Sequence, residues 1–172
     1  MKTLVAFFSQ SGNTKKIAEA IWAEASQADK ADLKKIEDVA AEDVLGYDFI
    51  FIGSPLHSGS LAAPAKAFLK GMQAASGQKM AGFITHFAPV YPEQDMNAFA
   101  EPIKTACEEK GIEYKGFFDC QGALTESLHT AVQKKLNLSD EQWANMVKQM
   151  TGHPNEEDIN KAKKFAKEVL AD

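Results

Sequence analysis

The sequence predicts an α/β protein in which a parallel sheet is covered by helices on both faces. Short apolar runs alternate with helical patterns along nearly the whole chain, as they do in successive βαβ units. Residues 3–8 and 48–53 are almost continuously apolar, which is typical of strands covered on both faces. The 172 residues are the length of one ordinary domain and are enough to bury a sizeable core.

Five strands are expected in this sheet. Each is a short run rich in apolar and β-branched side chains, bounded by polar residues, glycine or a helical pattern. Five such strands with helices between them predict a doubly wound, three-layer sandwich. The expected strands are residues 3–8, 33–36, 48–53, 79–85 and 113–120.

Three helices are expected between these strands, at residues 14–26, 65–72 and 97–110. Pro64 suits the first turn of the second helix, where a missing N–H group costs little. Pro102 lies inside the third pattern, so that helix is either kinked or starts late.

The part of the chain after residue 120 is longer than such a sandwich needs. Residues 125–136 have a helical pattern, and Ser139 caps a second helix with the spacing of a capping box. Asn155 caps a last helix, which is expected to close the sandwich. We therefore expect residues 1–172 to form a single domain that carries a helical insertion at about 125–150. His129 and His153 of this part are expected at the surface.

Composition limits the possible functions. The formal net charge of −5 and the isoelectric point near 5.4 make nucleic acid an unlikely partner, because phosphate neutralisation needs a basic face. The sequence shows no signal peptide and no apolar run long enough to span a bilayer, so a cytoplasmic protein without membrane contact is expected. Cys107 and Cys120 have no metal or redox spacing, and no metal is assigned. Both thiols are expected to be buried or partly buried.

A hydroxyl-rich loop between the first strand and the first helix predicts a phosphate site. Ligands of open parallel sheets bind at the carboxyl ends of the strands, and a helix N-terminus there presents unpaired N–H groups and a positive dipole end. Gly12 lets the backbone close around an oxygen-rich group. The loop contains no lysine, which a permanently held phosphate monoester does not need. The expected donors are Ser9, Ser11, Asn13 and Thr14.

Better-known phosphate sites are excluded by the same residues. The loop lacks the G-x-x-x-x-G-K-[ST] pattern of nucleotide triphosphatases, and no G-x-G-x-x-G fingerprint follows any expected strand. A response-regulator receiver needs acidic residues where the first and third strands end. The chain has Phe8-Ser9 and Gly53-Ser54 at those places.

The loop Ser9-Gln10-Ser11-Gly12-Asn13-Thr14, followed by Ala18 and Ile21, resembles the FMN phosphate-binding signature of the flavodoxin family. Residues 36–55 are similar to the second and third strands of that family and the link between them. Ala6 departs from the pattern, since the family prefers a bulkier residue there. The resemblance implies FMN as cofactor and a flavodoxin-like sheet of order 2-1-3-4-5.

The resemblance also implies two loops that hold the flavin ring. His57 with Leu56, and Phe87 with His86, would form its two walls, and Gly59 or a neighbour would let a peptide carbonyl turn toward the ring. For His57, ring contact, proton transfer and no flavin role all remain open. The first loop has no acidic residue to lower the potential by repulsion. The expected loops are Ser54-Pro55-Leu56-His57-Ser58-Gly59 and Thr85-His86-Phe87-Ala88-Pro89.

Three functions follow from these expectations. The leading one is a flavodoxin-like electron carrier that exchanges electrons with redox protein partners, as a monomer or weak homodimer, and has no catalytic residue of its own. The alternative is an FMN-dependent NAD(P)H oxidoreductase that reduces a quinone, a flavin or another small molecule, with residues 125–150 roofing its pocket; no nicotinamide motif supports it. The third is an interaction module without flavin, which the intact hydroxyl pattern disfavours.

Overall fold

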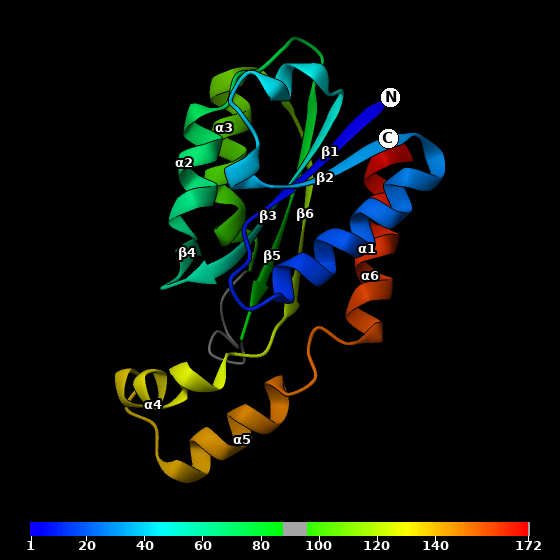
Figure 1. Ribbon diagram of the computed structural model, residues 1–172. Coiled ribbons are helices and arrows are strands. Elements are labelled where there is room, and N and C mark those ends of the chain that lie inside the picture. Colours follow the sequence, from blue (N-terminus) through cyan, green and yellow to red (C-terminus); the bar gives the residue numbers. More distant parts are fainter. Residues whose placement is uncertain (88–95, 172) are drawn as a thin grey trace.

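The computed structural model describes residues 1–87 and 96–171. The chain folds into a three-layer sandwich with a twisted sheet in the middle (Figure 1). Five strands pair in parallel in the order β2-β1-β3-β5-β6, which confirms the predicted order. Their bounds are Lys30–Lys35 for β2, Lys2–Phe7 for β1, Phe49–His57 for β3, Lys79–His86 for β5 and Glu113–Gln121 for β6.

The strand order reverses between β1 and β3, whose carboxyl ends lie side by side with Phe7 opposite Gly53. Loops that leave the sheet there diverge to opposite faces and open a crevice between them, the usual ligand position in open α/β sheets. The phosphate loop leaves from β1 and the first predicted flavin loop from β3.

Helices cover both faces of the sheet (Figure 1). Alternate side chains of each strand point to opposite faces, and Leu4 and Val5 accordingly belong to different core clusters. On one face, α1 (Asn13–Ala28) packs against α6 (Glu156–Ala171), which confirms that the last helix closes the sandwich. On the other face lie α2 (Ala63–Gly71) and α3 (Glu101–Lys110).

The structure adds a sixth, short strand that the sequence reasoning missed. β3 continues to His57 and pairs antiparallel with β4 (Ser60–Leu61). The turn between them has positive φ at both Ser58 (51°) and Gly59 (79°), the geometry of a type I′ hairpin turn. The first predicted flavin loop is therefore mostly a β-hairpin, and its conformation is set by strand pairing.

The third predicted helix starts late, which is one of its two expected outcomes. A 3₁₀ turn, Met96–Ala100, precedes α3, and Pro102 lies in the first turn of that helix. Proline is tolerated there because the first N–H groups of a helix have no intrahelical acceptor. Two further 3₁₀ turns, Ile36–Asp38 and Asp43–Gly46, connect β2 to β3.

Two helices, α4 (Glu126–Lys135) and α5 (Asp140–Met150), lie beyond the carboxyl edge of the sheet (Figure 1). The capping box is confirmed, since Ser139 Oγ accepts from the Gln142 amide at 3.2 Å and the Ser139 amide donates to Gln142 Oε1 at 2.9 Å. α4 has no buried residue and α5 has two, so this helix pair is packed far more thinly than the sandwich.

His129 and His153 were expected at the surface; both are partly exposed, but each side chain has a partner within the protein. His129 Nε2 donates to the Leu124 carbonyl at 3.2 Å, and its ring meets Trp143 edge-on at 5.3 Å. His153 Nδ1 donates to Asp158 Oδ2 at 2.6 Å. Sequence spacing does not reveal these partners, because they depend on how α4, α5 and α6 are placed.

Two searches of the described residues were negative. None of their helices combines the length and apolar character needed to cross a bilayer. They also contain no cluster of three or more His, Cys, Asp or Glu side chains arranged to hold a metal ion.

Candidate functional site

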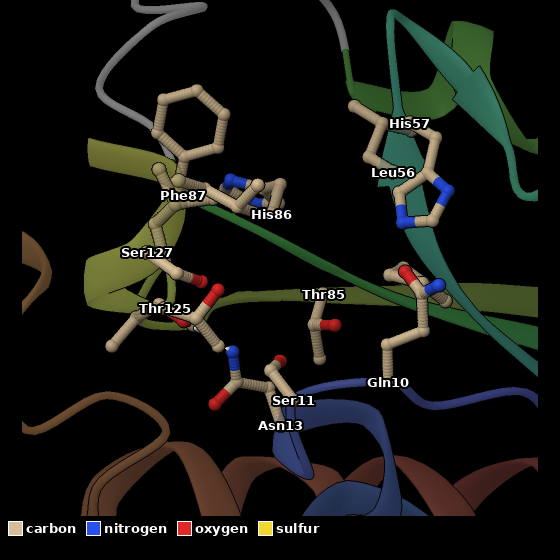
Figure 2. Close-up of a pocket in the computed structure, with 15 residues that line it drawn as sticks. Gln10, Ser11, Asn13, Leu56, His57, Thr85, His86, Phe87, Thr125 and Ser127 are labelled. Carbon is tan, nitrogen blue, oxygen red and sulfur yellow. Dashed lines mark hydrogen bonds between the residues drawn. The ribbon is translucent and has the colours of Figure 1, made fainter. Parts of the chain in front are cut away.

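A pocket of about 370 Å³ opens at the carboxyl edge of the sheet (Figure 2). It is lined by the phosphate loop, the ends of β3 and β5, and the segment that follows β6. The lining residues are Gln10, Ser11, Asn13, Pro55, Leu56, His57, Thr85, His86, Phe87, Gly122, Ala123, Leu124, Thr125, Ser127 and Leu128. The predicted phosphate loop and both predicted flavin loops thus meet at one cavity.

The phosphate loop is shaped by Ser9 and Gly12. Ser9 Oγ accepts from the backbone amides of Gly12 at 3.2 Å and Lys15 at 3.3 Å. Gly12 has φ +90°, a conformation that residues with a Cβ rarely adopt. The first-turn amides of α1 have no intrahelical acceptor, and that turn contains no acidic side chain. The start of α1 is therefore suited to an anion.

Thr14 and Asn13, like Ser9, are predicted phosphate donors whose side chains have partners within the protein. Thr14 Oγ1 lies 2.8 Å from Thr85 Oγ1, and both hydroxyls are buried. This pair fastens the start of α1 to the end of β5. Asn13 Nδ2 donates to the carbonyl of Ala123 at 2.7 Å. Donation to a phosphate stays a prediction for all three residues.

The first predicted flavin loop is held at its base by Ser54. This buried hydroxyl donates to the Pro55 carbonyl at 2.8 Å and accepts from the Ala62 amide at 2.9 Å. Pro55, Leu56 and His57 line the pocket. The base of the hairpin is therefore fixed where it reaches the pocket.

The tip of the hairpin points elsewhere. Ser58 and Gly59 form the exposed turn and are not among the lining residues. The Nζ atom of Lys135, in the last turn of α4, lies 3.4 Å from Ser58 Oγ. His57 meets the ring of Phe8 edge-on, with centroids 6.4 Å apart.

The second predicted flavin loop contributes Thr85, His86 and Phe87 to the lining. The His86 side chain is 9% exposed, and its Nε2 atom lies 3.1 Å from Asp119 Oδ2 on β6. This contact orients the imidazole on the wall opposite His57 (Figure 2). The other two predicted members, Ala88 and Pro89, lie outside the described residues.

The sequence reasoning named no individual site residue in the segment after β6, although its second candidate function had residues 125–150 roofing the pocket. Six of its residues nevertheless line the pocket, as the list above shows. A signal was present, because this segment leaves the carboxyl end of a parallel strand and so begins at the same edge as the other loops. What the sequence does not contain is the direction in which α4 leaves that edge.

The lining is polar at one end and apolar at the other. Gln10, Ser11 and Asn13 gather at the start of α1, and the apolar side chains lie away from it (Figure 2). Among the lining residues that the structure describes, the titratable side chains are His57 and His86. A ligand with an anionic end and an uncharged, largely apolar ring fits this arrangement, and a strongly cationic ligand does not.

Comparison with known proteins decides the family. The family model of the flavodoxin domain matches residues 4–167. The chain belongs to the flavodoxin family. Over 180 residues it is 30% identical to the flavodoxin-like domain-containing protein BilS of Clostridioides difficile, covering 99% of this chain and 97% of that protein.

Solved flavodoxins share the fold. Oxidised flavodoxin 2 from Bacillus cereus superposes with a TM-score of 0.69 and 23% identity, covering 99% of both chains. A flavoprotein from Lactobacillus acidophilus, solved in complex with FMN, has a TM-score of 0.52 and 24% identity and covers 69% of this chain and 92% of its own. These likenesses support the flavodoxin fold of the sheet and its flanking helices.

Proposed function

We propose that this flavodoxin-family chain binds FMN without a covalent bond and transfers electrons between redox protein partners. One observation carries the proposal: the start of α1 and the ends of β3 and β5 meet at a single pocket, and none of its lining residues in the described ranges 1–87 and 96–171 is acidic. When bound, FMN supplies the redox chemistry, while the protein provides binding, orientation and electrostatics.

The chain's own residues divide this work. The loop from Ser9 to Thr14 holds the phosphate through backbone amides and short polar side chains. Leu56 and His57 flank one side of the ring, and His86 and Phe87 flank the other. Ser54 and Thr85 act indirectly, since their bonds fix the hairpin and the start of α1. Ser58 and Gly59 shape the turn of the hairpin.

The test is a flavin assay on the purified chain. We expect yellow protein whose released flavin is FMN in a stoichiometric amount, and flavin-stripped protein that regains its colour with added FMN. A colourless chain that takes up no FMN contradicts the proposal.

The substitution Thr14→Val tests the phosphate site. Loss of one donor to a charged group should weaken FMN binding by about 1–3 kcal/mol, measured by fluorescence titration. Binding of riboflavin, which lacks the phosphate, should change less. Thr105→Val, at an exposed position of α3, is the matched control and should bind FMN normally. Unchanged FMN affinity of Thr14→Val would show that the Thr14 hydroxyl does not donate to the phosphate.

One observation favours the second candidate, an FMN-dependent NAD(P)H oxidoreductase. Thr125, Ser127 and Leu128 of the helical insertion line the pocket, so its wall is more closed than the predicted loops alone would make it. Anaerobic mixing with NADH or NADPH separates the two functions. Rapid bleaching of the flavin supports the enzyme, whereas an unchanged spectrum supports the carrier.

We further propose that residues 1–172 form one domain with an insertion at about 125–150, in a chain that is a monomer or weak homodimer. Strand β6 before the insertion and α6 after it belong to the same sandwich, which supports this. A single cooperative unfolding transition and a monomeric mass by analytical ultracentrifugation are expected. Separate transitions for the insertion and the sandwich would contradict the single domain.

A further inference from the structure

The phosphate loop touches the segment after β6 through one side chain. Asn13, the first residue of α1, donates from Nδ2 to the carbonyl of Ala123 at 2.7 Å, across 110 positions of sequence. Figure 2 shows the Asn13 amide directed toward the segment that carries Thr125. Because the contact is short and partly buried, it holds two distant parts of the chain at a fixed spacing.

Gly122 provides an independent sign that this contact is closely packed. A Cβ atom added at Gly122 would lie 2.8 Å from Asn13 Nδ2, 2.9 Å from Cγ and 3.0 Å from Cβ. Gly122 does not have a positive φ, so its backbone conformation does not require glycine. Its lack of a side chain makes room for Asn13 instead.

The segment after β6 also forms backbone hydrogen bonds with the end of β5 and with the residues before α6. The Gly122 amide donates to the His86 carbonyl at 2.7 Å, and the Ala123 amide donates to the His153 carbonyl at 3.0 Å. The Asn13 bond is the attachment that comes from the phosphate loop. Thr125, Ser127 and Leu128, which line the pocket, follow directly in the chain.

We infer that Asn13 is a positioning residue whose side chain holds the segment 122–128 against the phosphate loop and thereby sets the pocket wall. The sequence reasoning made Asn13 a phosphate donor. A phosphate donor affects the binding of ligands that carry a phosphate, whereas a residue that positions the wall affects the binding of every ligand that contacts the wall. The inference rests on the proposed function only in the experiment that measures flavin binding.

The first experiment compares FMN with riboflavin, which shares the ring and lacks the phosphate. In Asn13→Ala, both ligands should bind roughly 2- to 10-fold more weakly, the effect of one lost hydrogen bond. If only FMN weakens, or neither does, Asn13 does not position the wall. Asn160→Ala, at an exposed position of α6, is the matched control and should leave both affinities unchanged.

The second experiment needs no flavin. Gly122→Ala should destabilise the flavin-free chain in urea, because the new methyl group meets the Asn13 side chain. In the Asn13→Ala background the same change should cost less, since the two shortest contacts, to Nδ2 and Cγ of Asn13, are removed. Equal costs in the two backgrounds would overturn the inference. Gly46→Ala, where an added Cβ meets nothing within 4 Å, is the control and should cost the same in both.

A third measurement covers the case in which Gly122→Ala does not fold. Backbone amides of residues 124–128 should exchange hydrogen faster in flavin-free Asn13→Ala than in the parent chain, and unchanged exchange would overturn the inference. Failure of the parent chain to take up FMN would refute the proposed function and leave the two flavin-free results to judge Asn13.

Discussion

At the scale of single residues, burial decides the chemistry of the two cysteines. Burial raises the pKa of Cys107 to about 11, and the nearby Glu108 carboxylate adds to this effect. Burial also raises the pKa of Cys120, with further contributions from Asp158 and Asp119. Both thiols are buried, which confirms the expectation from their spacing.

We therefore expect neither thiol to react with Ellman's reagent in the native chain at pH 8, because the thiolate is the reactive form. Both should react once the chain is unfolded in urea. The absorbance that develops as thiols react with the reagent, followed over time in the native and in the unfolded chain, measures the reactive thiols in each state. A thiol that reacts within seconds in the native chain would contradict this expectation.

The phosphate loop shows how much of the site can be predicted from local sequence. Its polar residues and its position after a buried strand were enough to predict that it borders the ligand pocket. They were not enough to predict the partners of Asn13 and Thr14, which lie 110 and 71 positions away. Those contacts depend on how strands β5 and β6 are placed, and only the folded chain brings them together.

At the scale of elements, a hydrogen bond joins the edge strand β2 to Tyr47, two residues before β3. Tyr47 Oη donates to Asp32 Oδ2 at 2.8 Å. Burial, and then this bond, raises the pKa of Tyr47 to about 12. The same bond holds the pKa of Asp32 below its ordinary 3.8, against the opposing effect of burial.

Tyr47→Phe should therefore destabilise the chain by about 0.5–1.5 kcal/mol at pH 7. A carboxyl with a lowered native pKa stabilises the fold above its ordinary pKa, and this contribution is lost as the pH falls through the native value. The difference in stability between the two chains should thus shrink as the pH falls below the ordinary carboxyl pKa of 3.8. Urea unfolding at pH 7 and pH 3 measures the difference.

Tyr114→Phe is the matched control. Burial is the main reason that the pKa of Tyr114 is raised to about 12, and a buried neutral tyrosine does not titrate between pH 3 and 7. Its effect on stability should be the same at both pH values. A cost of Tyr47→Phe that is equally large at pH 3 would show that packing, not the bond to Asp32, is responsible.

Most elements could be predicted from their patterns, and the exceptions have physical reasons. The strand β3 was expected to end at Gly53 and runs on to His57, because pairing with β5 continues to Pro55 and pairing with β4 follows at Leu56 and His57. Pro102 limited the third helix to two outcomes, and α3 begins just before it. A hairpin without the usual Asn-Gly or Asp-Gly turn leaves a weak local signal.

At the scale of the whole molecule, stability is distributed unevenly. α1 buries six residues, α5 buries two and α4 buries none. Elements with few buried apolar contacts open locally at lower free energy than the core. Hydrogen exchange followed by mass spectrometry should therefore show faster exchange in residues 126–150 than in strands β1, β3 and β5. Equal protection of α4 and β5 would contradict this picture.

The sandwich was predictable because its apolar runs are long and regular. The position of α4 and α5 was not, since their amphipathic patterns indicate helices without indicating which edge they border. This limit also explains why no individual residue after β6 was named: the loop of residues 9–14 could be placed at the pocket from its own pattern, whereas the wall after β6 depends on tertiary placement.

The pairing of α1 with α6 has a consequence for how the chain is made. The face of the sheet covered by α2 and α3 has its helices once residue 110 has been synthesised. The opposite face carries Val5, Phe51 and Phe83, and it is completed only by residues 156–171, including the Phe165 ring that meets Phe51 at 6.4 Å. Domains made in this way expose apolar surface during synthesis. A nascent chain that has not yet reached α6 would present this half-covered face to chaperones.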